Sequence, residues 1–264
     1  MTIETQTAKP EQGVSAIFWL LIAGFALSGA ALAAGDLGGV GVFAFVFIGW
    51  IISLCLHEWG HAATAWIGGD RSIEERGYLT LNPLKYTNPL LSIGLPLLFL
   101  AMGGIGFPGG AVYVNQAQLR GPFWRVAVSA AGPAMNLVFL ALIGVVFATL
   151  DTYDGPGPFA AALAFLAFLQ ATALLLNLLP VPGLDGFGIL QGLLPEGARA
   201  ALAPISRIAV MAFLLIMFAA PQYLAPLWNA ALDLCQALGI DRRSIATGLD
   251  LFRFWAAPEA PFLR

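Results

Sequence analysis

Long uncharged runs of apolar residues alternate along this chain with short polar or charged connections. At about 1.5 Å of rise per residue, some 20 apolar residues in a helix cross the hydrocarbon core of a bilayer. Five runs approach or exceed that length, at residues 14–34, 40–56, 126–150, 159–179 and 208–224. The pattern therefore predicts an all-α polytopic membrane protein with about five to six transmembrane helices.

A further apolar segment, residues 89–107, is interrupted by Pro96, Gly103, Gly104 and Gly106. Basic residues stand on both sides of it, which favours entry and exit on the same face of the membrane. We therefore expect a re-entrant segment rather than a full span. Residues 77–82 and 111–115 are strand-like in sequence. They predict a small membrane-associated β element, with an edge that could pair with an extended peptide.

Composition supports a membrane protein and excludes some partners. Hydrophobic residues make up 59% of the 264 positions and charged residues 10%, whereas about a quarter of the residues in a soluble domain are charged. The formal net charge of −3 and the presence of only two lysines exclude nucleic acid as a partner. The bilayer itself is the expected environment.

The same pattern divides the chain into four stretches. Residues 1–13 form a polar N-terminal segment, and residues 14–39 form the first transmembrane helix with a short external turn. Residues 40–195 form the membrane core, and residues 196–264 hold a C-terminal transmembrane helix and a cytoplasmic or interfacial tail. No insertion is long enough to hold a separate soluble domain.

The charges of the connections predict an orientation. Asp36, Asp151 and Asp154 are the only charges in two acid-only turns, which are expected to face outward, and the basic connections are expected to face the cytoplasm. A multi-pass protein of the cytoplasmic membrane follows. Arg242 and Arg243 suggest a cytoplasmic tail, but that would require residues 226–241 to turn back, so the side of the C-terminus stays open.

The only two histidines of the chain lie in one pentapeptide, His57-Glu58-Trp59-Gly60-His61. Four residues are about one helical turn, so both imidazoles leave the helix on nearly the same side, a pattern typical of zinc sites. Glu58 is then placed to reach a metal-bound water. The alternative is a histidine pair satisfied by backbone carbonyls in a helix interface. It is disfavoured because three ionisable groups in an apolar run are costly to keep without a use.

Catalytic zinc usually takes three protein ligands. A third histidine six residues after His61 is absent, since Ile67 stands there, and residues 79–86 contain no glutamate. Asp185 is the surviving candidate, because it follows a long apolar run and is expected on the same side of the membrane. Its other interpretation is an ordinary Asp-Gly turn before the next helix.

Three motifs, taken together, resemble the site-2 protease family of intramembrane zinc metallopeptidases. They are His57-Glu58-Trp59-Gly60-His61, Gly132-Pro133-Ala134-Met135-Asn136, and the segment from Asn177 to Gly186.

Their order on three successive spans matches the three-helix catalytic core of that family, over roughly residues 40–195. The resemblance implies one Zn²⁺ per chain, held by His57, His61 and Asp185, with Glu58 as the catalytic residue. It also implies that Asn177 and Asn136 contact the substrate backbone or the oxyanion. Only 40 residues separate the second and third motifs, so this is similar to a compact member without PDZ or CBS domains.

The expected function is hydrolysis of a peptide bond in or near the transmembrane helix of another membrane-anchored protein. A metal transporter is an alternative, but transporters usually distribute ionisable groups along a pathway, and here they cluster at one depth. An inactive relative that binds membrane helices is a second alternative, although all four expected catalytic and metal positions are intact.

Overall fold

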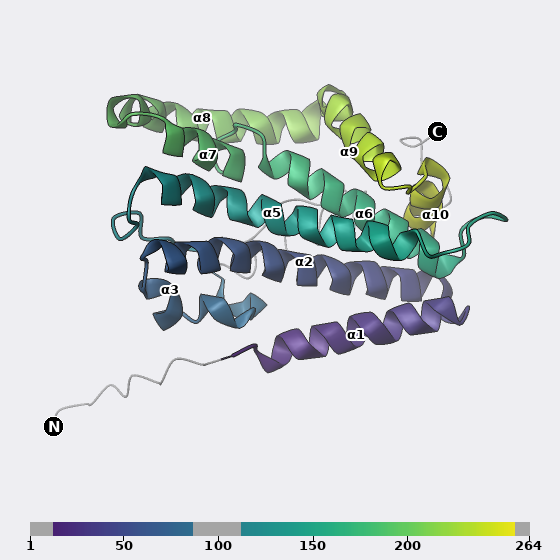
Figure 1. Ribbon diagram of the computed structural model, residues 1–264. Coiled ribbons are helices and arrows are strands. Elements are labelled where there is room, and N and C mark those ends of the chain that lie inside the picture. Colours follow the sequence, from purple (N-terminus) through teal and green to yellow (C-terminus); the bar gives the residue numbers. More distant parts are fainter. Residues whose placement is uncertain (1–12, 87–111, 257–264) are drawn as a thin grey trace.

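A computed structural model describes residues 13–86 and 112–256, and almost every element in these ranges is a helix (Figure 1). The α-helices are α1 (Ala16–Ala33), α2 (Gly38–Gly68), α3 (Ser72–Glu75), α5 (Pro122–Phe147), α6 (Pro158–Asn177), α7 (Asp185–Leu193), α8 (Glu196–Ala219), α9 (Ala225–Ala237) and α10 (Arg242–Phe252). Short 3₁₀ helices are η1 (Tyr78–Thr80), η2 (Pro83–Lys85) and η4 (Pro221–Leu224). The prediction of an all-α polytopic membrane protein is confirmed.

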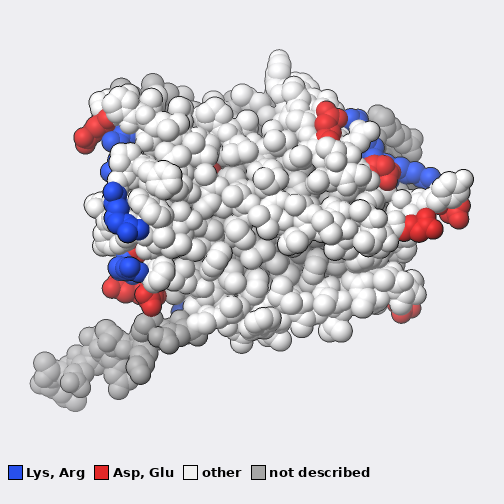
Figure 2. Space-filling model, in the orientation of Figure 1, with Lys and Arg blue, Asp and Glu red and all other residues white. Residues whose placement is uncertain are grey.

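Within the described residues, four helices are long and apolar enough to cross a membrane: α1, α2, α5 and α6. Helix α8 begins beside α7 and runs toward the opposite end of the molecule, where α9 continues (Figure 1). Figure 2 shows the charged side chains gathered at the two ends, with an uncharged band between them. This distribution is what a bilayer requires, since charge is costly in hydrocarbon.

Helices α2, α5 and α6 each pack against the other two and form the centre of the molecule. Most residues of α6 are buried, whereas α1 buries only a few and lies at the periphery against α2. Close approach of α2 and α5 depends on Gly60, where an added Cβ would lie 2.7 Å from the carbonyl oxygen of Ala131. Small residues at such crossings are the usual means of helix association in membranes.

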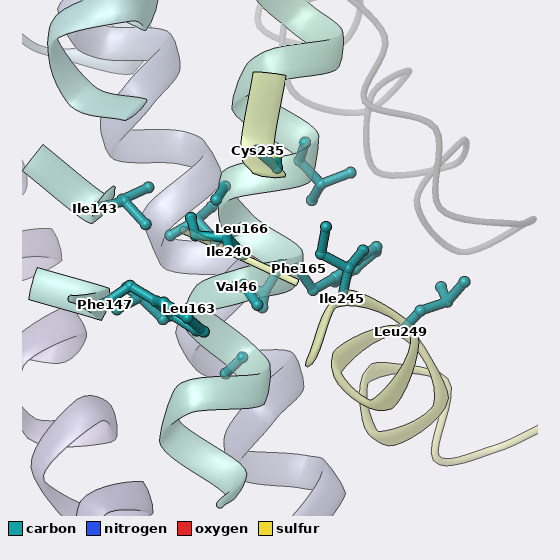
Figure 3. Close-up of a cluster of buried hydrophobic side chains, with 14 of the residues drawn as sticks. Val46, Ile143, Phe147, Leu163, Phe165, Leu166, Cys235, Ile240, Ile245 and Leu249 are labelled. Carbon is teal, nitrogen blue, oxygen red and sulfur yellow. The ribbon is translucent and has the colours of Figure 1, made fainter. Parts of the chain in front are cut away.

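The C-terminal helices lie at the end of the molecule opposite α3 (Figure 1). Helix α10 packs against the first half of α6, where a Cβ on Gly248 would overlap the carbonyl oxygen of Ala161. Figure 3 shows Ile245 and Leu249 of α10 among Phe165 and Leu166 of α6.

This packing decides a point that the sequence left open. Gly155 belongs to one of the acid-only turns and lies beside Arg243. A Cβ added to Gly155 would be 3.1 Å from the guanidinium of Arg243. Residues 226–241 do not turn back, because α9 continues from the end of α8 toward α10 (Figure 1). The described part of the tail therefore lies with the acid-only turns, at the end opposite Arg71 and Arg76.

The prediction of a small β element is wrong for the described residues, because they contain no strand. Residues 78–80 form the 3₁₀ helix η1, with the left-handed residues Gly77 (φ 72°) and Leu81 (φ 57°) at its two ends. The Thr80 N–H closes the turn on the carbonyl of Gly77, and a strand cannot accommodate such a turn. Residues 112–115 are irregular, and the expected re-entrant segment at 89–107 lies outside the described residues.

Candidate metal centre

Three side chains from two distant parts of the chain converge inside the helix bundle. The Nε2 atoms of His57 and His61 are 3.0 Å apart. Asp185 places Oδ2 3.2 Å from the Nε2 of His57 and Oδ1 3.2 Å from the Nε2 of His61. These donors all lie within 4.8 Å of one another, so the three residues form a group that could hold a metal ion.

Local structure explains the convergence. His57 and His61 are one turn apart on α2, so both imidazoles face α5. Asp185 is the first residue of α7, and an added Cβ on Gly186 would overlap the carbonyl oxygen of Leu178. A side chain at that position would push α7 away from the end of α6. Glycine therefore allows the chain to fold back sharply enough to bring Asp185 to the histidines.

The outer nitrogen of each imidazole has a polar partner. The Nδ1 of His61 is 2.7 Å from the carbonyl oxygen of Val128, and the Nδ1 of His57 is 2.6 Å from Oδ1 of Asn136. Both partners are oxygens that accept a hydrogen bond, so these contacts favour the tautomer of each imidazole that carries its proton on Nδ1. The two Nε2 atoms then present lone pairs to the carboxylate of Asp185.

This arrangement fits a bound cation. Lone pairs of two imidazoles and a carboxylate face one another, and Oδ2 of Asp185 is buried without a hydrogen-bond partner in the described part of the chain. Gly132 of α5 borders the same space: an added Cβ would lie 2.6 Å from the Nε2 of His57 and would overlap that of His61. The donor separations are close to the roughly 3.3 Å that zinc bonds of 2.0–2.1 Å give at tetrahedral angles. Two imidazoles and one carboxylate are a ligand set known for catalytic zinc.

Glu58 lies beside this centre and is 3% exposed. Its Oε2 accepts a hydrogen bond of 3.0 Å from the backbone N–H of Val112. Asp70, which is fully buried, accepts a further one of 2.7 Å from the N–H of Asn115. The irregular segment 112–115 is thus held against α2 by two carboxylates, one of which belongs to the predicted zinc motif.

The structure brings together His57, His61, Glu58, Asp185 and Asn136, five of the six residues singled out in the sequence. Asn177, the last residue of α6, is 5% exposed, and its side chain makes no hydrogen bond within the described residues. It lies next to Leu178, whose carbonyl packs on Gly186 at the start of α7.

Two further polar residues, Ser53 and Gln170, join this group and were missed in the sequence. Asn136 donates from Nδ2 to Ser53 Oγ and to Gln170 Oε1, both at 3.0 Å. The sequence held a signal for each of them: Ser53 stands one helical turn before His57, and Gln170 is an amide in the middle of an apolar run. Polar residues inside membrane helices are commonly functional.

Comparison with known proteins finds similar chains in several bacteria. A protein of Mycolicibacterium smegmatis named "Putative zinc metalloprotease Rip2" is 48% identical over 260 residues, which cover 96% of both chains. Its namesake in Mycobacterium tuberculosis is 44% identical over 262 residues, covering 96% of this chain and 98% of the other. "Putative zinc metalloprotease YwhC" of Bacillus subtilis is 34% identical over 200 residues, 72% of this chain and 88% of the other. No family model and no solved structure matches the chain.

Proposed function

We propose specific roles for the buried polar residues on the premise that the chain belongs to the site-2 protease family and is an intramembrane zinc metalloprotease. His57, His61 and Asp185 hold one Zn²⁺, and Glu58 is the general base. The observation that supports this most directly is the convergence of two imidazole Nε2 atoms and two carboxylate oxygens beside a buried glutamate.

A zinc ion bound there supplies Lewis acidity and lowers the pKa of a water molecule that it binds. The residues of the chain do the remaining work. Glu58 accepts a proton from the water molecule that attacks the peptide carbonyl. It then passes this proton to the departing amide nitrogen. Its hydrogen bond to the N–H of Val112 fixes one carboxylate oxygen. The buried setting keeps bulk water away and strengthens each electrostatic contact.

The position of the centre supports a substrate within the membrane. His57 stands 11 residues before Gly68, the last residue of α2, which is about 17 Å along the helix. A peptide bond must therefore enter the bilayer region to reach Glu58. We propose that the substrates are membrane-anchored proteins cut in or near a transmembrane helix.

The side of the membrane follows from charge. Arg71, Arg76, Lys85, Arg120 and Arg125 lie around the end of the bundle where α2 finishes and α5 begins. The excess of basic residues at this end favours the cytoplasmic face of the cytoplasmic membrane. We propose that the active site opens toward that face.

The two asparagines take different roles. Asn136 uses its oxygen on His57 and its nitrogen on Ser53 and Gln170, so its contacts favour support of His57 over contact with substrate. The amide of Asn177 is uncommitted among the described residues. We propose that Asn177 contacts the substrate backbone or the oxyanion.

A direct test combines metal content and cleavage on the full chain purified in detergent. Wild type should hold about one zinc per chain and cut single-span model substrates. Glu58→Gln should keep the zinc and lose cleavage by at least a hundredfold, while Asp185→Ala should lose the zinc.

Glu75→Gln is a matched control, because Glu75 is an exposed glutamate of α3; it should leave both properties unchanged. Folded wild-type protein without zinc affinity would refute the metal centre. Unchanged cleavage by Glu58→Gln would refute the role of the base.

A further inference from the structure

A buried polar network surrounds the outer nitrogen of His57. Asn136 of α5 contacts Nδ1 of His57 through its oxygen, and its nitrogen donates to Ser53 of α2 and Gln170 of α6. The Ser53 hydroxyl in turn donates to Gln170 Oε1. All four residues are buried, with Gln170 fully enclosed. The network therefore joins the three central helices around one imidazole.

The two imidazoles are not held in the same way. The partner of His61 is the backbone carbonyl of Val128, which can only accept, so Nδ1 of His61 must carry the proton. The partner of His57 is a carboxamide, which presents an acceptor at one end and donors at the other. The protonation pattern of His57 thus depends on which way the Asn136 amide is turned.

Gln170 and Ser53 determine that orientation. With Gln170 Oε1 facing Asn136, the Asn136 nitrogen turns toward it and the Asn136 oxygen turns to His57. If both amides were reversed, the Asn136 NH₂ would donate to Nδ1, and the imidazole proton would move to Nε2. A proton on Nε2 would occupy the lone pair that faces Asp185.

We propose that Gln170 and Ser53 are positioning residues for the metal centre. They turn the Asn136 amide so that the lone pair on Nε2 of His57 is available to zinc. This inference rests on the proposed metal centre, and it assigns to α6 a part in metal binding although α6 supplies no ligand.

The cost of Gln170 supports a functional reason for its presence. Its Nε2 is buried without a hydrogen-bond partner in the described part of the chain, in a helix whose other buried residues are almost all apolar. An apolar residue of similar shape would avoid that unsatisfied donor. Packing alone therefore gives no reason for an amide at this position.

The test is Gln170→Met, which preserves length and removes the acceptor. Zinc affinity of the full-length protein in detergent is measured by competition with a chromophoric chelator, alongside the thermal midpoint of the metal-free protein. Zinc binding should weaken about tenfold, the lower end of the range for a lost partner of a ligand, because Gln170 acts on His57 only through Asn136. The midpoint should fall modestly, because the Ser53 hydroxyl and the Asn136 amide lose an acceptor while the unsatisfied Nε2 of Gln170 is removed.

Two further variants sharpen the result. Thr172→Val is the matched control: Thr172 is buried in the same helix, but its hydroxyl donates only to the carbonyl of Phe168. It should keep wild-type zinc affinity. Gln170→Glu retains an acceptor oxygen for Asn136 and should recover most of the affinity that Gln170→Met loses. Ser53→Ala should also weaken zinc binding. It is the variant used to test the network if Gln170→Met does not fold.

The outcomes separate this inference from the proposed metal centre. If wild type binds no zinc, the metal centre itself fails. If wild type binds zinc and Gln170→Met binds it within threefold as tightly, the positioning role is refuted. An equal loss in Thr172→Val, or no recovery in Gln170→Glu, would show that the effect comes from packing and would also refute it.

Discussion

Replacing Gly132 by alanine adds one methyl group where α5 faces the two imidazoles of α2. The new carbon would lie 2.6 Å from the Nε2 of His57 and would overlap that of His61, whereas ordinary contacts begin at 3.4 Å. Both rings, or α5 itself, must therefore shift, by about 0.8 Å at His57 and by more at His61. Metal–ligand distances tolerate only about 0.2 Å of change, so we expect zinc affinity to fall at least a hundredfold and cleavage to disappear.

The same substitution should weaken the fold far less than it weakens zinc binding. Alanine favours the interior of a helix by roughly 1 kcal/mol over glycine, but Pro133 follows in α5, and a Cβ before proline is disfavoured in a helix. Displacing the imidazoles adds an overpacking cost of about 1–3 kcal/mol. The metal-free variant should therefore stay folded and unfold at a lower temperature than the metal-free wild type.

Zinc affinity by chelator competition and the thermal midpoint of the metal-free protein measure the two effects separately. Gly144→Ala, further along α5, is the control, because its nearest neighbour is the side chain of Leu238 at 3.3 Å, which can yield by a small shift. It should bind zinc like wild type. Wild-type zinc affinity in Gly132→Ala would refute the placement of the metal between α2, α5 and Asp185.

Three further predictions concern parts of the chain away from the metal. Asp70→Ala removes the carboxylate that accepts a hydrogen bond from the N–H of Asn115. It should destabilise the protein by about 2–4 kcal/mol in detergent denaturation and speed proteolysis near residue 115. Unchanged stability would contradict this anchoring. Burial raises the pKa of the Cys235 thiol to about 12, so the thiol stays protonated and unreactive at pH 8. Mass spectrometry should show little alkylation until the protein unfolds, and rapid modification of the native protein would contradict the burial. Asp241→Ala should cost about 1 kcal/mol, because the Asp241 carboxylate caps α10. Partial burial would raise the pKa of Asp241, but hydrogen bonds from Ser244 outweigh it and lower that pKa. The stabilisation should therefore be present above about pH 3.9 and disappear as pH falls through the lower folded value, and an equal effect of Asp241→Ala at pH 2 and pH 7 would refute this.

The membrane helices and the metal centre could be predicted because each rests on a strong local rule. An apolar run in a bilayer has almost no alternative to a helix, and the observed α1, Ala16–Ala33, lies within the predicted 14–34. The helical spacing of His57 and His61 fixed their common face before any tertiary contact was known. Asp185 followed because an incomplete ligand set required a third donor at the same depth.

The rest depended on tertiary contacts. Residues 77–82 have a strand-like sequence but form a turn. The left-handed backbone of Leu81 and the hydrogen bond from the N–H of Thr80 to the carbonyl of Gly77 close this turn locally. The polar network was missed for a different reason. Ser53 and Gln170 each stood out on their own helix, but only the crossing of three helices brings them to Asn136.

The separation of the proposed metal ligands along the chain also sets an order of events during synthesis. His57 and His61 leave the ribosome early, whereas Asp185 stands at the start of α7, after α5 and α6 have been made. At about 5–20 residues per second, the interval between the histidines and Asp185 is on the order of ten seconds. A nascent chain that has inserted its first helices therefore lacks the third donor. With the proposed ligand set, the metal centre can be completed only after α5 and α6 have been made.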